Sequence, residues 1–441
     1  MALSSCARTQ RLDAEVIVVG AGLAGLYAAR LLATEGRDVV VLEASDRVGG
    51  RTYSLDIDGH VSEAGGEQIG SSYARIRDVA AQEGLVIKPD GPGLPMHIHL
   101  GGDVILPEDW ADHPLNPMPA AFRRATPGSA LFIAASQDNP LDDPFAWGEL
   151  DDVSAEDFLK AKGFSDEALR LIDHTLNAQT LSTYGMANVF RSLALYQLDR
   201  EGGPSGHLVG GMQRLAEAMA ATLDLRMGWG VTRVEERGSH VEVVRRTPDG
   251  EERLWAESVV VATPLTSGPG VESAAWEDLP AVREALTPYT QIHQIHFRAA
   301  PRDYHIWCDG PMERIFAHRD ADGSPTGLFR AWVNGQGALD LFRDVDDEGR
   351  DLAHAPERAL EPLMGEVEVE RIVSWTLAEP LGQGGGAYFH FKPGQARKFY
   401  RAFEPRQSRI VLAGEHTARI HTGLEGAMES GERAAFHILG I

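Results

Sequence analysis

The hydrophobic pattern of the chain begins with a short run of β-branched residues, Val16–Val19, that stops at a glycine-rich segment. Four apolar residues are too few for a helix, so the run predicts a buried parallel strand. Residues 26–32 continue with helical spacing, and Val39–Leu42 form a second apolar run. This order of strand, glycine turn, helix and strand predicts a βαβ unit in an α/β protein.

Three glycines, Gly20, Gly22 and Gly25, separate the first strand from the helix in the spacing G-x-G-x-x-G. The first allows a tight turn, the second lets a phosphate approach the backbone, and the third lets the helix pack closely on the strand. The free N–H groups at the start of the helix would then face a pyrophosphate. Glu43 ends the second strand, where an acid binds ribose hydroxyls. The pattern favours a dinucleotide site over a glycine turn without a ligand.

Later segments alternate between the pattern of this lobe and that of a second lobe. Residues 88–150 are rich in Pro, Gly and Asp, residues 154–200 have helical spacing, and residues 288–386 are rich in strands. Apolar runs at 231–244, 258–262 and 410–414 predict strands that return to the first lobe. We therefore expect a dinucleotide-binding domain from residues 12–88, 207–284 and 386–441, a substrate domain from residues 89–206 and 285–385, and a loose tail at residues 1–11.

Composition narrows the classes of partner. The chain has 441 residues, with 65 acids against 41 bases and a net charge of −24, which disfavours binding to nucleic acid or to an anionic membrane. Cys6 and Cys308 cannot form a disulfide framework, which predicts a cytoplasmic protein. Residues 1–12 lack a secretory signal, and glycines at turn spacing exclude a membrane helix at residues 16–33. The histidine pairs lack supporting Cys or acidic ligands, so we expect no metal. A homodimer is left open.

Five blocks resemble the flavin-containing amine oxidase family, which shares the glutathione-reductase type of FAD fold. They are VIVVGAGLAGLYAARLL, VVVLEASDRVGGRT, GGEQIG, LVGGMQRLAEAMA and LAGEHTARIHTGLEGAMESGERAA. The resemblance covers residues 14–440. It implies a Rossmann-like FAD-binding domain interleaved with an α+β substrate domain, and FAD in an elongated crevice with the substrate facing its isoalloxazine ring.

The resemblance also implies which residues contact FAD. Val231 would contact the adenine side through its backbone, Gly414 and Glu415 would meet pyrophosphate or ribityl groups, and Leu424 would offer a backbone N–H to a flavin carbonyl. The helix dipole at Leu424 would stabilise the reduced flavin. The full expected set is Gly20, Gly22, Gly25, Glu43, Arg47, Gly50, Arg51, Gly66, Val231, Gly414, Glu415, Gly423 and Leu424.

Three departures from the family pattern concern the flavin ring. The cysteine that binds FAD covalently in monoamine oxidases has no counterpart in Gly385–Tyr388, so we expect non-covalent FAD. The two tyrosines that enclose an amine in those enzymes correspond to Ala387 and Gly423, which implies a larger or less basic substrate. The lysine that holds a water near the flavin corresponds to His293.

Four residues are candidates for chemistry on the substrate, each with a structural alternative. Glu67 could act as a base with a raised pKa, bind a cation, or bond only to its neighbours. His293 could act as a base, position a water, or be a core histidine. Arg330 interrupts an apolar strand and could bind a carboxylate or pair with an acid. Tyr184 could line the cavity or belong to the core.

Together these features predict an FAD-dependent oxidase that removes a hydride from a carbon next to an amine or amide nitrogen. Molecular oxygen would reoxidise the flavin and give H₂O₂, and the substrate would be a bulky natural product whose imine or iminium could cyclise. One alternative is an FAD-dependent desaturase acting on C–C bonds. Another is a non-enzymatic module like those that escort prenylated small GTPases.

Overall fold

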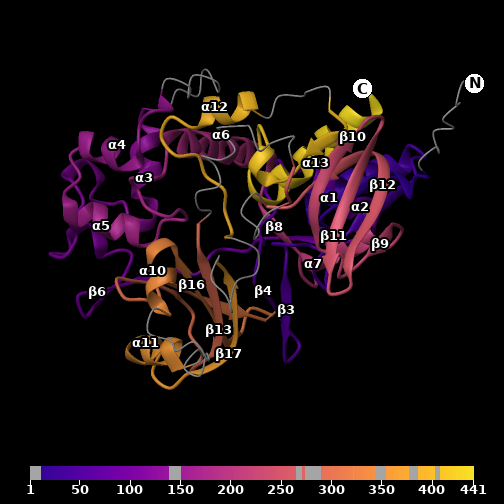
Figure 1. Ribbon diagram of the computed structural model, residues 1–441. Helices are drawn as coiled ribbons and strands as arrows, with labels where there is room; N and C mark the ends of the chain where they lie inside the picture. Colours follow the sequence, from indigo (N-terminus) through magenta and orange to yellow (C-terminus); the bar gives the residue numbers. More distant parts are fainter. Residues whose placement is uncertain are drawn as a thin grey trace, which may run out of the picture.

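The computed structural model describes residues 11–138, 150–264, 271–273, 290–320, 322–342, 354–376, 386–402 and 408–441. They form two lobes, each built around a seven-stranded sheet (Figure 1). Among these residues, no helix combines the length and apolarity needed to span a membrane.

The first sheet contains the predicted βαβ unit. Its strand order is β10-β11-β12-β1-β2-β9, with β18 paired to β12. The first strand pairs in parallel with the second, Val16 opposite Val39. The expected single strand at 231–244 is instead an antiparallel hairpin of two strands. The strands are β1 (Ala14–Val19), β2 (Val39–Leu42), β9 (Asp224–Arg226), β10 (Val231–Arg237), β11 (His240–Thr247), β12 (Gly250–Val261) and β18 (Ile410–Leu412).

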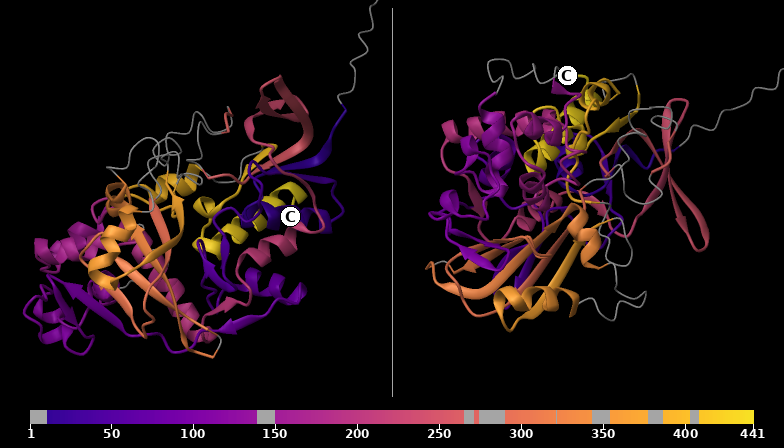
Figure 2. Two further views of the ribbon diagram at one scale, coloured as in Figure 1. Left: turned by 90° about the horizontal axis from the view of Figure 1, so that it is seen from below. Right: turned by 90° about the vertical axis from the view of Figure 1, so that its left-hand side faces the viewer.

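Both faces of the first sheet are covered, which explains why β1 is apolar at successive positions. Val16 and Val18 pack against helices, whereas Ile17 and Val19 pack against residues of the β10–β12 strands. Figure 2 shows these three strands at the end of the molecule remote from the second sheet. The covering helices are α1 (Leu23–Thr34), α2 (Ala74–Gln82), α7 (Gln213–Ala220) and α13 (Gly423–Leu439).

The second sheet has the order β17-β13-β16-β15-β14-β6-β7. One face packs on helices α10 (Gly335–Leu341) and α11 (His354–Met364). The other face meets the first lobe near Trp375, and Trp307 packs into a helical core at the far end. The strands are β6 (Met96–Leu100), β7 (Asp103–Ile105), β13 (Ile292–Arg298), β14 (His305–Cys308), β15 (Arg314–Arg319), β16 (Pro325–Asn334) and β17 (Glu368–Trp375). The helices of that core are α3 (Pro127–Ser136), α4 (Ala155–Ala161), α5 (Asp166–His174) and α6 (Met186–Gly202).

The chain crosses between the lobes through short pairings. Strand β5 pairs with β8, close to the expected boundaries at 88/89 and 206/207. The expected boundary at 284/285 lies outside the described residues. Residues 386–402 pack on the second lobe, because Phe391 and Phe399 contact Ala187 of α6, so the return to the first lobe comes later than expected. The remaining elements are β3 (Ser54–Ile57), β4 (His60–Glu63), β5 (Ile87–Pro89), β8 (Gly206–Leu208), α12 (Ala396–Ala402), η1 (Trp110–Asp112), η2 (Ala120–Phe122) and η4 (Glu415–Thr417).

Candidate active site

The glycine turn after β1 has two distinct steric requirements. A Cβ on Gly25 would lie 2.0 Å from the carbonyl oxygen of Gly20, so only glycine lets α1 pack this closely on the turn. A Cβ on Gly22 would meet nothing within 4 Å. Gly22 is the N-cap of α1, and because glycine has no side chain, it does not cap the first N–H groups of the helix. The start of α1 therefore borders open space where a phosphate fits.

A second glycine turn lies beside the first. Gly49 pairs with Gly22, and Gly50 has a positive φ of 57°. The N–H of Gly49 donates to the carbonyl of Ala21 and links the two turns, and Glu43 Oε2 accepts from the N–H of Ala21 at 2.7 Å. Val231 begins β10 close by, because Trp229 donates to the carbonyl of Glu43. Gly22, Gly49, Glu43 and the start of β10 thus lie together at the carboxyl ends of β1 and β2.

The two arginines of this segment have different surroundings. Arg51 donates to the carbonyl of Ala387 at 2.6 Å and lies 3.8 Å from Glu415, so it joins three segments of the crevice. Arg47 instead stacks on the ring of Tyr53, 4.2 Å from its centroid, and burial lowers its pKa. Contact of Arg47 and Arg51 with the cofactor stays a prediction for both.

Polar atoms remain unpartnered where the flavin chain is expected. Glu415 Oε2 and both ring nitrogens of His416 are buried and have no hydrogen-bond partner among the described residues. Burial lowers the pKa of His416 to about 3, so the ring is neutral. Gly414, with φ of 134°, leaves room for this ring, since a Cβ there would lie 2.4 Å from it. These orphaned groups fit the ribityl hydroxyl groups of FAD, which both donate and accept hydrogen bonds.

The turn formed by Gly65 and Gly66, just before Glu67, packs against the start of α13. A Cβ on Gly66 would lie 2.4 Å from the side chain of Leu424, whereas a Cβ on Gly423 would meet nothing within 4 Å. Leu424 therefore lies against the Gly66 turn, beside open space at Gly423. The position is suited to the flavin ring, as the resemblance implies for Leu424.

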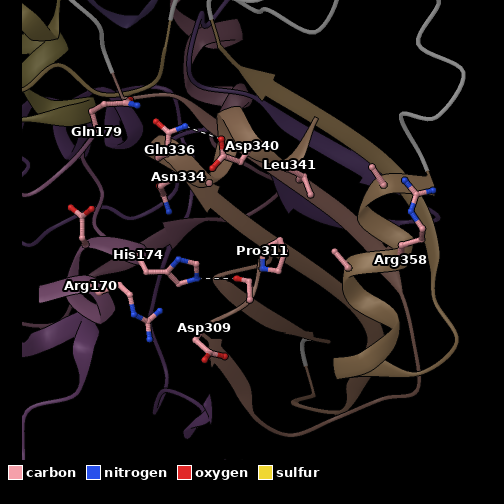
Figure 3. Close-up of a pocket in the computed structure, with 15 residues that line it drawn as sticks. Arg170, His174, Gln179, Asp309, Pro311, Asn334, Gln336, Asp340, Leu341 and Arg358 are labelled. Atoms are coloured by element: carbon pink, nitrogen blue, oxygen red, sulfur yellow. Dashed lines mark hydrogen bonds between the residues drawn. The ribbon is translucent and has the colours of Figure 1, made fainter. Parts of the chain in front are cut away.

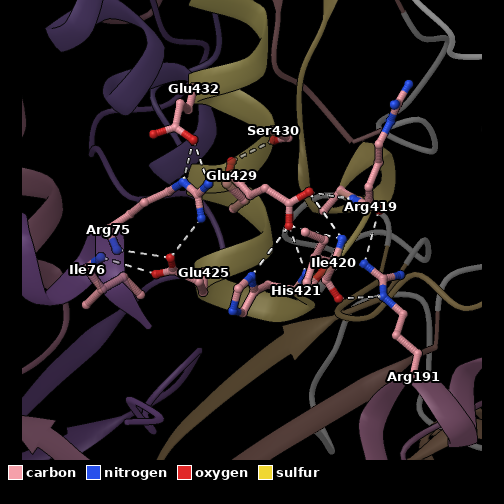
Figure 4. A network of polar contacts seen from close by, with 12 residues as sticks. Arg75, Ile76, Arg191, Arg419, Ile420, His421, Glu425, Glu429, Ser430 and Glu432 are labelled. Carbon is pink, nitrogen blue, oxygen red and sulfur yellow. Dashed lines mark hydrogen bonds and ion pairs between the residues drawn. The ribbon is translucent and has the colours of Figure 1, made fainter. Parts of the chain in front are cut away.

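Buried carboxylates hold the start of α13 in place (Figure 4). Glu425 accepts from the backbone N–H groups of Arg75 and Ile76, at 3.0 and 3.2 Å, and so caps α2. Glu429 accepts from the N–H groups of Arg419, Ile420 and His421 at 2.7–3.2 Å. Arg191 of α6 donates to the carbonyls of residues 418, 420 and 421 and ties this loop to the second lobe.

We predict that Glu429→Ala lowers the free energy of unfolding by about 2–4 kcal/mol, because several partly buried N–H groups lose their acceptor. Burial opposes ionisation, but contact with His421 and the backbone N–H groups lower the pKa of Glu429 to about 2. Its contribution is therefore complete above the ordinary pKa of 4.5 and is lost as pH falls toward 2. Thermal unfolding measures the effect, with the exposed Glu217→Ala as control. Equal melting temperatures for both variants would contradict the prediction.

Two of the predicted catalytic residues, Glu67 and Arg330, form an ion pair. Arg330 Nη2 lies 2.7 Å from Glu67 Oε2, and Nη1 donates to the carbonyl of Glu63 at 2.7 Å. The Glu67 side chain is 45% exposed and that of Arg330 12%. Arg330 lowers the pKa of Glu67, which outweighs the effect of burial. The expected raised pKa of Glu67 was therefore wrong, and the group is better suited to hold a charge than to accept a proton.

Aromatic rings flank this pair, although the sequence suggested that the aromatic cage was missing. Trp332 lies two residues beyond Arg330 on β16 and stacks with Tyr388 at 6.4 Å. Phe316 lies opposite Arg330 on the neighbouring strand β15. The guanidinium carbon of Arg330 is 5.6 Å from the ring centroids of both Phe316 and Trp332. That Ala387 and Gly423 replace the two tyrosines stays a prediction, and Trp332, Phe316 and Tyr388 were missed as site residues. Phe316 and Trp332 have the spacing of core residues on apolar strands, so the sheet register identifies them, and Tyr388 joins them from a loop that pairs with Thr290.

The structure does not bring His293 to this site. It lies on β13 opposite Val333 and hydrogen-bonds the carbonyl of Ala338 in α10 at 2.7 Å, on the face turned away from Arg330. Burial lowers its pKa to about 4. Gln294 is opposite Trp332 and shares its face. The register thus corrects the alignment, placing Gln294 rather than His293 beside the aromatic residues.

Tyr184 belongs to the core between α5 and α6. It is 9% exposed and meets the edge of His390 at 5.5 Å. Thr290 Oγ1 lies 3.2 Å from the His390 ring. Tyr184 packs in the helical core rather than beside Glu67, which favours the interpretation of Tyr184 as a core residue over that of a cavity residue. Gly385 lies outside the described residues.

Comparison with known proteins identifies the family. The model of the flavin containing amine oxidoreductase family matches residues 23–439. Pseudooxynicotine dehydrogenase from Pseudomonas sp is 26% identical over 97% of this chain and 86% of its own length. Putrescine oxidase from Kocuria rosea is 26% identical over 97% of this chain and 96% of its own length.

Solved structures show the same fold. Cyclohexylamine oxidase from Brevibacterium oxydans superposes with a TM-score of 0.75 at 20% identity, over 97% of this chain and 99% of its own. This likeness confirms the predicted FAD-binding domain with an interleaved substrate domain. The chain therefore belongs to the flavin-containing amine oxidoreductase family, whose members oxidise C–N bonds with FAD.

Proposed function

We propose that this protein is a cytoplasmic oxidase that removes a hydride from the carbon next to nitrogen in a bulky amine or amide. The observation that carries the proposal is the Glu67–Arg330 ion pair, set between aromatic rings on the sheet face that meets the first lobe. His296, on that face, bonds Ser62 of β4 at 2.9 Å. The pair is therefore close to the turn that carries Gly66.

The site residues have separable roles in this proposal. FAD, when bound, supplies the two-electron acceptor, and molecular oxygen reoxidises it with release of H₂O₂. Trp332 and Tyr388 form an apolar wall that excludes water and orients the carbon skeleton of the substrate. Glu67 retains its charge at neutral pH and attracts a nitrogen that carries a proton. Arg330 holds the Glu67 carboxylate in position.

Substrate size follows from the space at Gly423. A Cβ there would meet nothing within 4 Å, so the position that is aromatic in monoamine oxidases is open. A bulky molecule can fill this volume with its own carbon atoms. The imine or iminium formed there is open to attack by a carbon of the same molecule, so the proposal includes cyclised products.

Anaerobic mixing with candidate substrates tests this function. We expect rapid loss of flavin absorbance with large amines or amides and slow loss with benzylamine, phenethylamine and putrescine. A preference for the small amines would contradict the proposed substrate class. Bleaching by unsaturated hydrocarbons alone would favour the C–C desaturase, and no bleaching by any compound would favour a binding module.

The electron acceptor that reoxidises the flavin needs its own test, because one relative is named as a dehydrogenase and not as an oxidase. Peroxide released on admission of air would equal the substrate consumed if oxygen is the acceptor. Slow reoxidation in air, together with fast reoxidation by an electron carrier, would instead indicate a dehydrogenase.

We predict that the bound FAD is non-covalent, because residues 385–388 contain no cysteine. Acid precipitation of the purified protein should leave the yellow flavin in the supernatant, where its absorbance can be compared with that of the native sample. Flavin retained in the washed pellet would contradict this prediction.

A further inference from the structure

A second guanidinium, that of Arg314, lies beside Trp332 on the sheet face that carries Arg330. The strand register places Arg314 opposite Trp332, and Phe316 opposite Arg330, on the neighbouring strands β15 and β16. The guanidinium carbon of Arg314 is 5.3 Å from the centroid of the Trp332 ring. Two arginines and two aromatic residues therefore alternate at the four corners of one patch of the sheet.

Arg314 has no acidic partner in the described part of the chain. Its one hydrogen-bond acceptor there is the neutral amide oxygen of Asn177, 2.5 Å from Nη2. Arg314 is partly buried, and burial lowers its pKa, although a guanidinium remains charged in proteins. A desolvated cation without a counter-ion is unfavourable, so an anion bound at Arg314 would stabilise it.

Glu313, the next residue in the chain, does not supply that anion. Its side chain contacts α10, on the other face of the sheet from Trp332, where a Cβ on Gly337 would lie 2.4 Å from Glu313 Oε1. Burial raises the pKa of Glu313 to about 8, so the carboxyl group is largely neutral at pH 7. Figure 3 shows the cavity on that side, to whose lining Asn334 and Gly337 belong but Arg314 does not. The charge of Arg314 therefore faces the substrate side of the sheet.

Arg314 is at the end of the patch that is remote from the expected flavin. Arg330 is tied to the first lobe through the carbonyl of Glu63, whereas Arg314 is tied to the segment after α5 through Asn177. Diagonal neighbours on adjacent strands are about 7–8 Å apart. A ligand that contacts both Glu67 and Arg314 must therefore be longer than an α-amino acid, whose two charges belong to one carbon and its substituent.

We propose that the substrate carries a carboxylate that Arg314 binds, separated from the reacting nitrogen by about the length of one aromatic ring. This inference rests on the proposed function, in which Glu67 attracts the nitrogen. Nη1 of Arg314 has no acceptor among the described residues and would donate to the carboxylate. The Trp332 ring, which both guanidinium groups approach, would contact the carbon skeleton between the two charges. Because Glu67 is already paired with Arg330, the patch has an excess positive charge that a simple amine cation would not neutralise.

Calorimetric titration of the FAD-loaded enzyme with 4-(2-aminopropan-2-yl)benzoate tests this assignment. A para-substituted ring separates the ammonium and carboxylate groups of this ligand. The carbon next to nitrogen has no hydrogen, so the enzyme cannot oxidise it. The matched ligand, 4-(2-aminopropan-2-yl)benzamide, has nearly the same shape without the negative charge. We expect the benzoate to bind about tenfold more tightly than the benzamide, because a hydrogen bond between charged groups is stronger than one to a neutral oxygen.

Variants of β15 locate the source of this preference. Arg314→Met should abolish it, whereas Arg314→Lys should keep part of it because the positive charge remains. Arg319→Met, the same change at the exposed end of the strand, should leave it unaltered. As a test of length, 2-aminoisobutyrate should bind equally to the wild type and to Arg314→Met, since its carboxylate is too close to its nitrogen. Should Arg314→Met not fold, Arg314→Gln replaces it.

Equal affinity of the wild type for the benzoate and the benzamide, or no binding of either, would overturn the proposal. A preference for the carboxylate that persists in Arg314→Met would also overturn it, because the anion would then bind elsewhere. Binding of these ligands requires no turnover. A preference that depends on Arg314, together with no flavin bleaching by any amine, would therefore count against the oxidase function and not against the anion site.

Discussion

Gly25→Ala should yield little folded enzyme, whereas Gly22→Ala should fold normally and bind FAD weakly. The new Cβ at position 25 would lie 2.0 Å from the Gly20 carbonyl oxygen and 3.2 Å from the Cβ of Ala262. Backbone atoms cannot move aside without shifting α1 from the sheet, and such overpacking costs about 1–3 kcal/mol or more. The pair of variants separates packing from ligand binding within a single turn.

Gly22 has φ of −74°, which alanine adopts without strain, and its Cβ would meet no protein atom within 4 Å. The methyl group would instead occupy the space where the pyrophosphate is expected. Thermal unfolding of the apo forms and the ratio of flavin to protein absorbance measure the two effects. A Gly22→Ala enzyme with full flavin content would show that the pyrophosphate binds elsewhere. A Gly25→Ala enzyme as stable as the wild type would show that the turn can relax.

The nucleotide half of the protein was predictable because its signals are local. Gly25, Gly22 and Glu43 belong to a single βαβ unit, and the constraint on each follows from neighbours near in sequence. In the structure a Cβ on Gly25 would meet the Gly20 carbonyl, as expected, whereas the ligand contacts of Gly22 and Glu43 stay predictions. The prediction failed where a boundary depends on distant packing: residues 386–402 remain with the second lobe because Phe391 and Phe399 pack on α6.

The substrate half depends on strand register, which the sequence does not display. A shift of one residue along a strand moves a side chain to the other face of the sheet. His293 and Gln294 are adjacent, yet only Gln294 shares the face of Trp332 and Arg330. Alignment to a family lysine selected the wrong one. The Glu67–Arg330 pair joins residues far apart in the chain, so both could be suspected separately but the effect of Arg330 on the pKa of Glu67 could not.

The effect of Arg330 on Glu67 leads to the last prediction, on Arg330→Met. Arg330 lowers the pKa of Glu67, whereas burial raises it. Without the guanidinium, the pKa of Glu67 should rise, and Glu67 should take up a proton at a higher pH than in the wild type. A hydrogen bond to a charged group contributes about 1.5–3 kcal/mol, so we expect kcat/KM for a protonated amine to fall about 10- to 100-fold. The loss should deepen as the pH falls, because the neutral carboxyl no longer attracts the substrate cation.

Two histidines near Arg330 could give a similar pH dependence. Burial and Arg330 lower the pKa of His296 to about 3 and that of His305 to about 4, so both would also titrate higher in Arg330→Met. The double variant Glu67→Gln/Arg330→Met distinguishes the sources, because glutamine has no proton to gain. If Glu67 is responsible, the new acidic limb of the kcat/KM profile disappears in the double variant while flavin content stays unchanged. An acidic limb that persists would assign the titration to the histidines and remove Glu67 from its proposed role as the charge that attracts the amine.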